Sequence, residues 1–227
     1  MKIAALFSGG KDSTLALYEA IKDAHDIVCL VSVIPRNPES YMFHYPNIGL
    51  VKHQARAMQT PIITKETKGE KEKELRDMEK ALLEAKNKYG AEGVVVGAIE
   101  SEYQNSRVSK VCRPLGLKVV APLWHRKPEE LWGQLLDCRF RVIITAVACE
   151  GMDESWLGRE IDHKALDRLL ALSKKHRFHP SGEGGEFETF VKDGPLFKYD
   201  IMVKKARKVW EYNSGMYVIE EVKLEEK

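Results

Sequence analysis

Short apolar runs alternate with amphipathic stretches through the first half of the chain. Residues 2–7, 29–34, 61–64, 93–97 and 117–121 are apolar runs that end near glycine, proline or charge, as buried strands do. Between them, residues 13–24, 48–58, 69–89 and 108–115 have the spacing of helices. This alternation predicts an α/β fold with a mostly parallel sheet and helices on both faces.

The pattern changes after residue 124, which predicts a boundary near residues 122–128 and domains at 1–125 and 126–227. Residues 128–136 and 162–176 are expected as helices and residues 141–148 as a strand. Two long strand-like runs, 199–212 and 216–224, flank a hairpin-turn signal, Asn213-Ser214-Gly215. The glycine-rich stretch at 181–189 is expected as a shaped loop. The second part is therefore a smaller α+β region.

Composition narrows the classes of function. The 227 residues are 44% hydrophobic and 31% charged, and a formal net charge of +2 does not indicate a general nucleic-acid-binding surface. No apolar run approaches the roughly 20 residues that cross a bilayer, and no signal-peptide core is present. We therefore expect a cytoplasmic protein with no membrane partner. Cys29, Cys112, Cys138 and Cys149 form no C-x-x-C pair, which disfavours a zinc or iron–sulfur site.

The candidate chemistry begins at Ser8-Gly9-Gly10-Lys11-Asp12-Ser13, between the first strand and the first helix. A glycine-rich turn there lies at the carboxyl edge of a parallel sheet, and its backbone N–H groups can approach an anion closely. The serine hydroxyls and the Lys11 ammonium suit phosphate oxygens, and Asp12 suits a Mg²⁺ ion that bridges phosphates. The alternative is a plain turn with a helix cap. The order of residues matches neither the Walker nor the dinucleotide-binding glycine pattern.

SGGKDS resembles the pyrophosphate-binding loop of the N-type ATP pyrophosphatases, which cleave ATP between its α- and β-phosphates. Together with GAIESEYQNSRVSKVC at 97–112 and EGGEFET at 183–189, it makes nearly the whole chain similar to the archaeal and eukaryotic diphthine–ammonia ligase family. The resemblance implies a Rossmann-like domain of the adenine nucleotide alpha hydrolase type. It also implies that ATP, with Mg²⁺, adenylates the diphthine carboxylate of translation elongation factor 2. Ammonium then gives diphthamide, with AMP and pyrophosphate as the other products.

The ends of two further strands complete the expected nucleotide site. Ser32 and Val33 lie at the end of the second strand, a segment that contacts adenine through its backbone in the superfamily. Gly97, Ala98 and Ile99 end the strand at 93–97, and Gly97 would permit close approach of the adenosine. From the residues alone, a plain turn at Gly97 is an equal alternative.

Polar residues farther along are expected to meet the acceptor and to take part in catalysis. The candidate catalytic residues are Lys11, Asp12, Arg107, Glu183 and Glu186. The candidate substrate-binding residues are His44, Asn47, Ser101, Tyr103, Gln104, Gly184, Gly185, Glu188 and Thr189. The arginine suits the α-phosphate or the substrate carboxylate, with a surface ion pair as its alternative. The glutamates suit ammonium or the trimethylammonio group of diphthine, with a mobile surface loop as their alternative.

Two other functions stay open. A tRNA-modifying ATP pyrophosphatase predicts AMP formation stimulated by tRNA and a basic surface stripe. A non-catalytic nucleotide-binding module of the universal-stress type predicts ATP binding without turnover, and it leaves Lys11 and Asp12 without a role. The expected partners are elongation factor 2 and ammonium, with no stable nucleic-acid partner. The C-terminal hairpin also offers an edge for a homodimer.

Overall fold

The protein is described from a computed structural model. It covers residues 1–35, 47–67 and 71–227, with only the backbone for residues 71–73, 104 and 105. Among the expected site residues, His44 and the side chain of Gln104 lie outside this description. No helix in the described ranges is both long and apolar enough to cross a membrane.

Five parallel strands form the N-terminal sheet: β1 (Lys2–Leu6), β2 (Asp26–Pro35), β3 (Ile62–Thr67), β4 (Gly93–Val95) and β5 (Lys118–Val120). Their order is β3-β2-β1-β4-β5, so the chain reverses its direction of travel across the sheet between β1 and β4. Open α/β sheets bind their ligands at such a switch point, outside the carboxyl ends of the strands. The Rossmann-like class is confirmed, and the switch point marks where a site belongs.

Helices cover both faces of this sheet: α1 (Lys11–Lys22) and α2 (Val51–Ala57) on one face, and α3 (Lys71–Tyr89) and α4 (Glu102–Cys112) on the other. A short 3-10 turn, Ile48–Leu50, precedes α2. Helix α4 begins at Glu102 and not at residue 108 as expected. Its first turns carry exposed polar residues, so its apolar spacing starts only at Val108.

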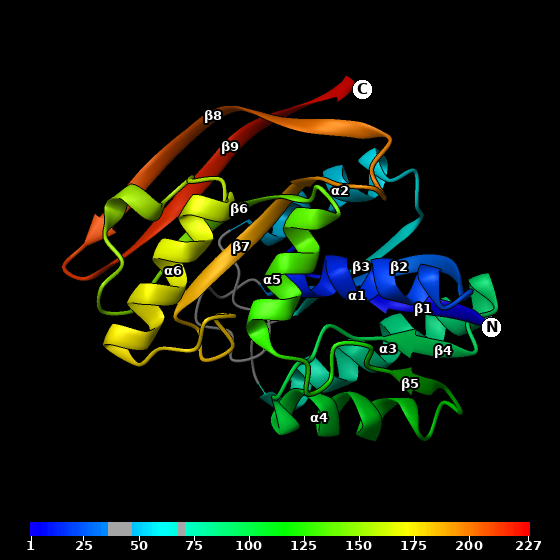
Figure 1. The fold of residues 1–227 in the computed structure, drawn as a ribbon. Helices are drawn as coiled ribbons and strands as arrows, with labels where there is room; N and C mark the ends of the chain where they lie inside the picture. Colours follow the sequence, from blue (N-terminus) through cyan, green and yellow to red (C-terminus); the bar gives the residue numbers. More distant parts are fainter. Residues whose placement is uncertain (36–46, 68–70) are drawn as a thin grey trace.

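The C-terminal sheet is antiparallel, in the order β7-β6-β9-β8. Its strands are β6 (Arg141–Val147), β7 (Phe187–Asp193), β8 (Tyr199–Glu211) and β9 (Ser214–Glu226), with the helices α5 (Pro128–Asp137) and α6 (His163–His176) and a 3-10 turn at Glu154–Trp156. The smaller α+β region is therefore confirmed. In Figure 1 the β8–β9 hairpin arches from the side of α6 towards α2.

Two expectations for this half are wrong. Residues 187–189 belong to β7 and not to a loop, because the run FETFVKD is rich in aromatic and β-branched residues, which favour a strand, directly after the glycines. The hairpin turn is Tyr212-Asn213 and not Asn213-Ser214-Gly215. Gly215 pairs with Trp210 inside the ladder, and Tyr212 takes a left-handed backbone with φ of 54°.

One hydrophobic cluster joins the two halves. It holds Ile3 and Leu15 from the parallel sheet and its first helix, and Trp132, Trp156 and Phe187 from the C-terminal region. The C-terminal sheet therefore packs on the same side of the parallel sheet as α1. The division into two domains at residues 125 and 126 stays a prediction.

Candidate active site

A cleft of about 750 Å³ lies between the two sheets, at the carboxyl ends of β1, β2 and β4. The expected site residues that line it are Ser8, Gly10, Lys11, Asp12, Ser13, Ser32, Val33, Gly97, Ala98, Ser101, Tyr103, Glu183, Gly184, Gly185, Glu188 and Thr189. The structure thus brings the SGGKDS turn and the EGGEFET segment to one cavity, although more than half of the chain separates them.

The SGGKDS turn leads directly into α1. Gly10 is the N-cap of α1, and as a glycine it offers no side chain of its own to cap this helix end. Gly9 has a φ of 81°, which strains any residue with a Cβ atom. The Ser8 and Ser13 hydroxyls lie 3.1 Å apart at the mouth of the turn. A helix N-terminus with two hydroxyls beside it is suited to an anion.

Strand β7 holds this turn from the C-terminal side. The Lys11 backbone N–H donates to Thr189 Oγ1 at 3.1 Å, and the Val191 N–H donates to the Gly9 carbonyl at 3.0 Å. The buried Gln54 amide on α2 donates to the Gly9 and Val191 carbonyls, both at 2.8 Å. The shape of the SGGKDS turn, called the phosphate turn below, therefore depends on residues that lie far away in the sequence.

Lys11 is the charged centre of the cleft. Its side chain is only 3% exposed, and Nζ donates to both Asp12 carboxylate oxygens, at 2.9 and 2.7 Å, and to the Ser181 carbonyl at 2.6 Å. Nζ also lies 5.3 Å from the centre of the Trp132 ring and 5.9 Å from that of Phe187. A buried ammonium is stabilised only by partners of this kind. Its positive charge suits an anion in the cleft.

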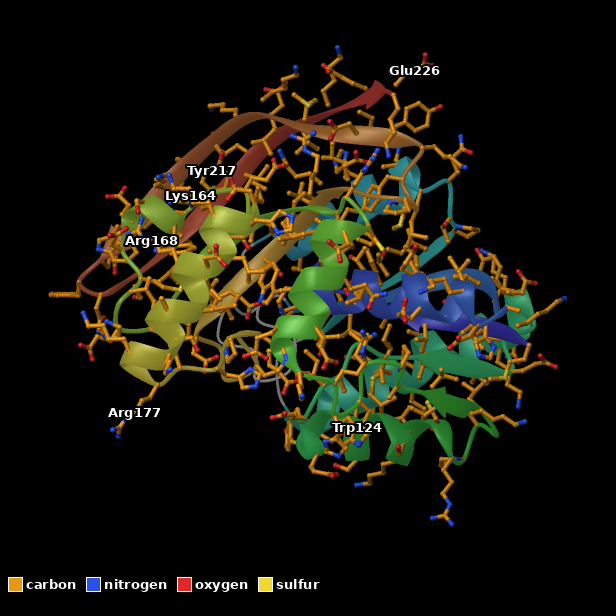
Figure 2. The ribbon with its side chains drawn as sticks, in the orientation of Figure 1. Trp124, Lys164, Arg168, Arg177, Tyr217 and Glu226 are labelled. Atoms are coloured by element: carbon orange, nitrogen blue, oxygen red, sulfur yellow. The ribbon has the colours of Figure 1, made fainter. Side chains whose placement is uncertain are left out.

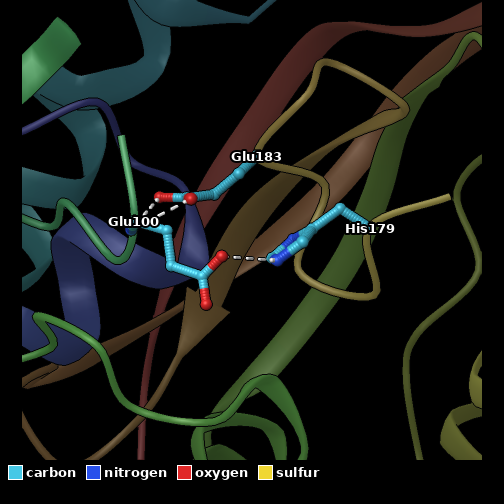
Figure 3. Close-up of side chains that lie close together, drawn as sticks. All are labelled: Glu100, His179 and Glu183. Atoms are coloured by element: carbon cyan, nitrogen blue, oxygen red, sulfur yellow. Dashed lines mark hydrogen bonds and ion pairs between the residues drawn. The ribbon is translucent and has the colours of Figure 1, made fainter. Parts of the chain in front are cut away.

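Glu183 ties the glycine-rich loop to the end of β4. Its Oε1 accepts from the Ile99 and Glu100 N–H groups at 2.9 and 3.1 Å, and Oε2 accepts from Glu100 at 3.0 Å. Figure 3 shows the Glu100 carboxylate facing His179, whose Nε2 lies 3.6 Å from Glu100 Oε2. These three side chains have the spacing of a metal site. We interpret them as contacts that hold the glycine-rich loop to the end of β4, because both Glu183 oxygens already accept from backbone amides.

Glu186 shapes the same loop from within. One carboxylate oxygen accepts from the His179 N–H at 2.8 Å, and the other accepts from the Gly184 N–H, also at 2.8 Å. Glu186 is not among the side chains that line the cleft. The geometry thus gives the two glutamates expected to be catalytic, Glu183 and Glu186, a role in holding the loop.

Glu188 differs from both. It is partly exposed to the cleft, and within the described ranges no hydrogen bond reaches its carboxylate. Burial raises its pKa from 4.5 to about 8; Lys11 lowers it, and Asp12 and Glu186 raise it further. A carboxyl group in this state exchanges protons near neutral pH.

The C-terminal sheet supplies the second wall of the cleft. Register places Glu188 of β7 opposite Ala146 of β6, Ala146 opposite Met216 of β9, and Met216 opposite Val209 of β8. All four line the cleft. With neighbouring strands about 4.8 Å apart, the row spans roughly 14 Å. An apolar path therefore leads from the hairpin to a single carboxylate beside the phosphate turn.

Other expected site residues do not line the cleft. Asn47 donates its amide to the Tyr217 carbonyl at 2.9 Å and accepts from the Ile219 N–H at 3.0 Å, so it holds β9. The Arg107 guanidinium stacks over the Tyr103 ring, with 4.9 Å from its carbon to the ring centre. Gly9 and Ile99 also do not line the cleft. The Gly9 carbonyl accepts from the Gln54 amide, and the Ile99 N–H donates to Glu183.

Sequence reasoning missed the hairpin side of the cleft, which is lined by Val209, Glu211, Ser214, Gly215 and Met216. No local pattern marks these residues, because only the register of β9 on β6 brings them there. Gln54 was also missed, although it carried a signal. It is a polar residue on the buried side of an amphipathic helix, and such a residue needs buried partners.

The strand order, the glycine turn after β1 and the cleft at the switch point define a nucleotide-binding α/β protein. The family model for the diphthamide synthase N-terminal domain matches residues 1–119, and that for the C-terminal domain matches residues 127–224. The chain belongs to this diphthamide synthase family.

Several relatives bear the name diphthine–ammonia ligase. The protein from Bos taurus is 36% identical over 228 residues, which cover 92% of this chain and 85% of the relative. The protein from Homo sapiens is 35% identical with the same coverage. The protein from Schizosaccharomyces pombe is 32% identical over 95% of this chain and 38% of its own length.

One solved structure is described as a predicted subunit of a tRNA methyltransferase from Methanocaldococcus jannaschii. It matches with a TM-score of 0.41 and 15% identity, over 86% of this chain and 99% of that chain. A likeness this low carries no argument about fold or function.

Proposed function

We propose that this protein is an ATP-dependent ligase that adenylates the diphthine carboxylate on translation elongation factor 2 and amidates it with ammonium. The supporting observation is that one cleft joins the phosphate turn to the EGGEFET segment. Lys11 makes this connection directly, since its Nζ donates to Ser181 and its backbone N–H donates to Thr189. Membership of the diphthamide synthase family supports the choice of acceptor.

In this proposal the adenosine lies at the ends of β2 and β4. Ser32 is 2% exposed and lines the cleft, and its hydroxyl finds no hydrogen-bond partner within the described ranges, which leaves it available to a ligand. A Cβ atom on Gly97 would lie 2.7 Å from the backbone of both Asp12 and Ser13. Only glycine therefore lets the end of β4 sit against the start of α1, where the triphosphate would lie.

Asp12 with the Ser8 and Ser13 hydroxyls is a donor set that fits Mg²⁺, whose remaining ligands would be phosphate oxygens and waters. The Asp12 side chain is 29% exposed and lies at the cleft, and its carboxylate is held by Lys11. When bound, the ion would neutralise charge on the pyrophosphate. Lys11 would then be free to stabilise the charge that develops as the α–β bond breaks.

The reaction has two steps. A carboxylate oxygen of the acceptor attacks the α-phosphorus, and pyrophosphate leaves. Ammonia then attacks the carbonyl carbon of the adenylate, and AMP leaves with the original carboxylate oxygen. The protein contributes by holding the two reactants in line and by excluding water from the adenylate, which would otherwise hydrolyse.

Charge favours this acceptor over tRNA. In the described ranges the charged residues that line the cleft are Asp12, Glu183, Glu188 and Glu211, with Lys11 as the one cation. A cleft of this sign attracts the trimethylammonio group of diphthine and repels an RNA backbone. Exposed cations lie elsewhere, and Arg177 projects outward from the end of α6 (Figure 2). The binding-module alternative leaves the buried Lys11–Asp12 pair without a function.

The acceptor belongs to the translation machinery, so we propose the cytoplasm as the place of reaction. A homodimer through the hairpin stays a prediction. The edge strand β8 exposes Lys204, Lys205, Arg207 and Lys208, and such charges oppose pairing between two edges. Size-exclusion chromatography with light scattering would decide this point.

The experiment that tests the proposed function follows the acceptor oxygen. Elongation factor 2 carrying diphthine, labelled with heavy oxygen in its carboxylate, is incubated with ATP, Mg²⁺, ammonium and the protein. We expect one labelled oxygen in AMP and an amide on the acceptor. AMP that carries no label would show that ATP is only hydrolysed, and the proposal would be wrong.

A further inference from the structure

The amide-forming step needs a place for ammonium, and beside the phosphate turn the cleft has a carboxylate, Glu188, that meets no hydrogen-bond donor within the described ranges. Glu188 lies on β7, one residue before Thr189, whose hydroxyl binds the phosphate turn. It also faces the apolar row of the C-terminal sheet, beside Ala146. Its carboxylate thus stands between the proposed nucleotide site and the proposed acceptor path.

The neighbouring glutamates are less suited to this task. Each Glu183 oxygen accepts from a backbone amide of the β4–α4 connection, and each Glu186 oxygen accepts from an amide within its own loop. A carboxylate held in this way has few lone pairs left for a second cation. The Glu211 carboxylate also meets no hydrogen-bond donor within the described ranges, but it lines the cleft from β8, at the opposite end of the row from Glu188 and the phosphate turn.

We propose that the Glu188 carboxylate binds the ammonium ion and accepts its proton, so that ammonia is released beside the acyl-adenylate. This inference rests on the proposed function. Nothing else about the nucleotide or the acceptor changes with it, because adenylation needs no ammonium. Glu188 would thus be a catalytic residue of the second step alone.

The chemistry balances without another reactant. Ammonium gives one of its four protons to Glu188, and the nitrogen lone pair then forms the bond to the carbonyl carbon. A second proton passes from nitrogen to solvent water as the bond to AMP breaks, and AMP leaves with the electron pair. The product amide keeps two hydrogens on nitrogen, and Glu188 returns its proton to solvent before the next turnover.

The surroundings suit a weakly held cation. Burial raises the pKa of Glu188 to about 8, so the group gains and loses its proton near neutral pH, and a cation bound beside it would favour the carboxylate form. The charged groups that act on it are Lys11, Asp12 and Glu186. Lys11 is already paired with Asp12, and Glu186 adds negative charge, so a small cation next to Glu188 is favoured electrostatically.

The test compares nucleophiles in the complete enzyme. Initial rates of AMP formation are measured with saturating ATP and diphthine-carrying elongation factor 2, while either ammonium or hydroxylamine is varied. Hydroxylamine is uncharged at neutral pH and needs no proton acceptor before it attacks. The variants are Glu188→Gln, which keeps the size of the side chain, and Glu188→Asp, which keeps its charge. Glu221→Gln, an exposed change on β9 outside the cleft, is the matched control.

We expect Glu188→Gln to lower kcat/KM for ammonium about 100-fold or more, the usual scale for loss of a general base. Its rate with hydroxylamine should stay within about threefold of the unaltered enzyme, and Glu188→Asp should recover part of the ammonium activity. The KM values for ATP and acceptor should not change, and Glu221→Gln should behave as the unaltered enzyme in every assay.

Two results would overturn the inference. Equal loss with ammonium and hydroxylamine would mean that Glu188 serves adenylation. A raised KM for the acceptor with an unchanged KM for ammonium would mean that Glu188 binds the trimethylammonio group instead. If the unaltered enzyme formed no AMP with acceptor and either nucleophile, the proposed function itself would be wrong, which is a different outcome from both.

Discussion

The two walls of the cleft are built by different means. The nucleotide wall consists of strand ends and turns of the parallel sheet, and mostly backbone faces the cavity at Gly10, Gly97 and Ala98. The acceptor wall is the face of an antiparallel sheet, and its character comes from side chains brought into one row by register. The first wall suits a ligand shared by many proteins, and the second suits a particular acceptor.

This contrast also explains how the walls depend on each other. The phosphate turn is short and contains glycines, so it cannot keep its shape alone. Gln54, Thr189 and Val191 hold it through three hydrogen bonds from α2 and β7, and a fourth joins Gln54 to Val191. A substitution in the acceptor wall should therefore also change nucleotide binding. The following predictions measure the size of this effect.

The largest effect should come from Lys11→Met, which removes the ammonium from the junction of the walls. Asp12 would lose its charged partner and the Ser181 carbonyl would lose its donor. We expect the rate of AMP formation at saturating substrates to fall by roughly 100- to 1,000-fold, as when a donor to developing charge is removed. Lys22→Met, at the exposed end of the same helix, should leave the rate unchanged. An active Lys11→Met variant would remove Lys11 from the mechanism.

The second largest effect should be a difference in stability between alanine substitutions at two glycines. In Gly97→Ala the new Cβ atom would lie 2.7 Å from the Asp12 and Ser13 backbone, so β4 and α1 must move apart. We expect a loss of about 1–3 kcal/mol in the free energy of unfolding and a raised KM for ATP. Gly133→Ala in α5 meets nothing within 4 Å and should gain about 0.5–1 kcal/mol. Urea unfolding measures both, and equal stability of the two variants would contradict the close contact at Gly97.

A smaller effect concerns pH and the acceptor wall. The pKa of Glu188 is raised from 4.5 to about 8, so the folded protein binds this proton more tightly than the unfolded chain. Its contribution is complete below 4.5 and is lost as the pH rises to about 8. The unaltered protein should therefore lose up to about 1.4 kcal/mol per pH unit more than Glu188→Gln over this range. Identical pH dependence of urea unfolding in both proteins would place Glu188 in a more polar environment.

The smallest effect should come from Thr189→Val, which preserves the shape of β7 but removes the acceptor for the Lys11 N–H. We expect a loss of about 0.5–1.5 kcal/mol in the free energy of unfolding, together with weaker ATP binding. Thr64→Val on β3 is the control, since the Thr64 hydroxyl makes no hydrogen bond within the described ranges. If both variants bound ATP equally well by calorimetry, the two walls would be independent.

The sequence was most informative where structure is local. Apolar runs predicted the strands of the parallel sheet, because a strand buried on both faces is apolar at successive positions. SGGKDS predicted a tight turn at the edge of the sheet, because its glycines act within one turn, and phosphate binding by its lysine and hydroxyls stays a prediction. The first turns of α4 and the strand β7 were missed. The first turns of α4 are polar and so lack apolar helical spacing. The glycines directly before β7 made its first residues resemble part of a loop.

The second wall could not be predicted in the same way. Register alone brings Met216 and Val209 into line with Glu188, and register depends on pairings between segments that are far apart in the chain. The sequence grouped Glu183, Glu186 and Glu188 by proximity and could not tell them apart. Their roles differ in the structure because backbone amides meet the first two and none in the described ranges meets the third.

The most direct test of the proposed ligase is AMP release from ATP in matched reactions. Each contains the protein, Mg²⁺ and ammonium, with either diphthine-carrying elongation factor 2, the same factor already amidated, or bulk tRNA. The proposed function predicts AMP only with the first acceptor, in an amount equal to the amide formed. AMP that appears with tRNA, or without any acceptor at the same rate, would contradict it.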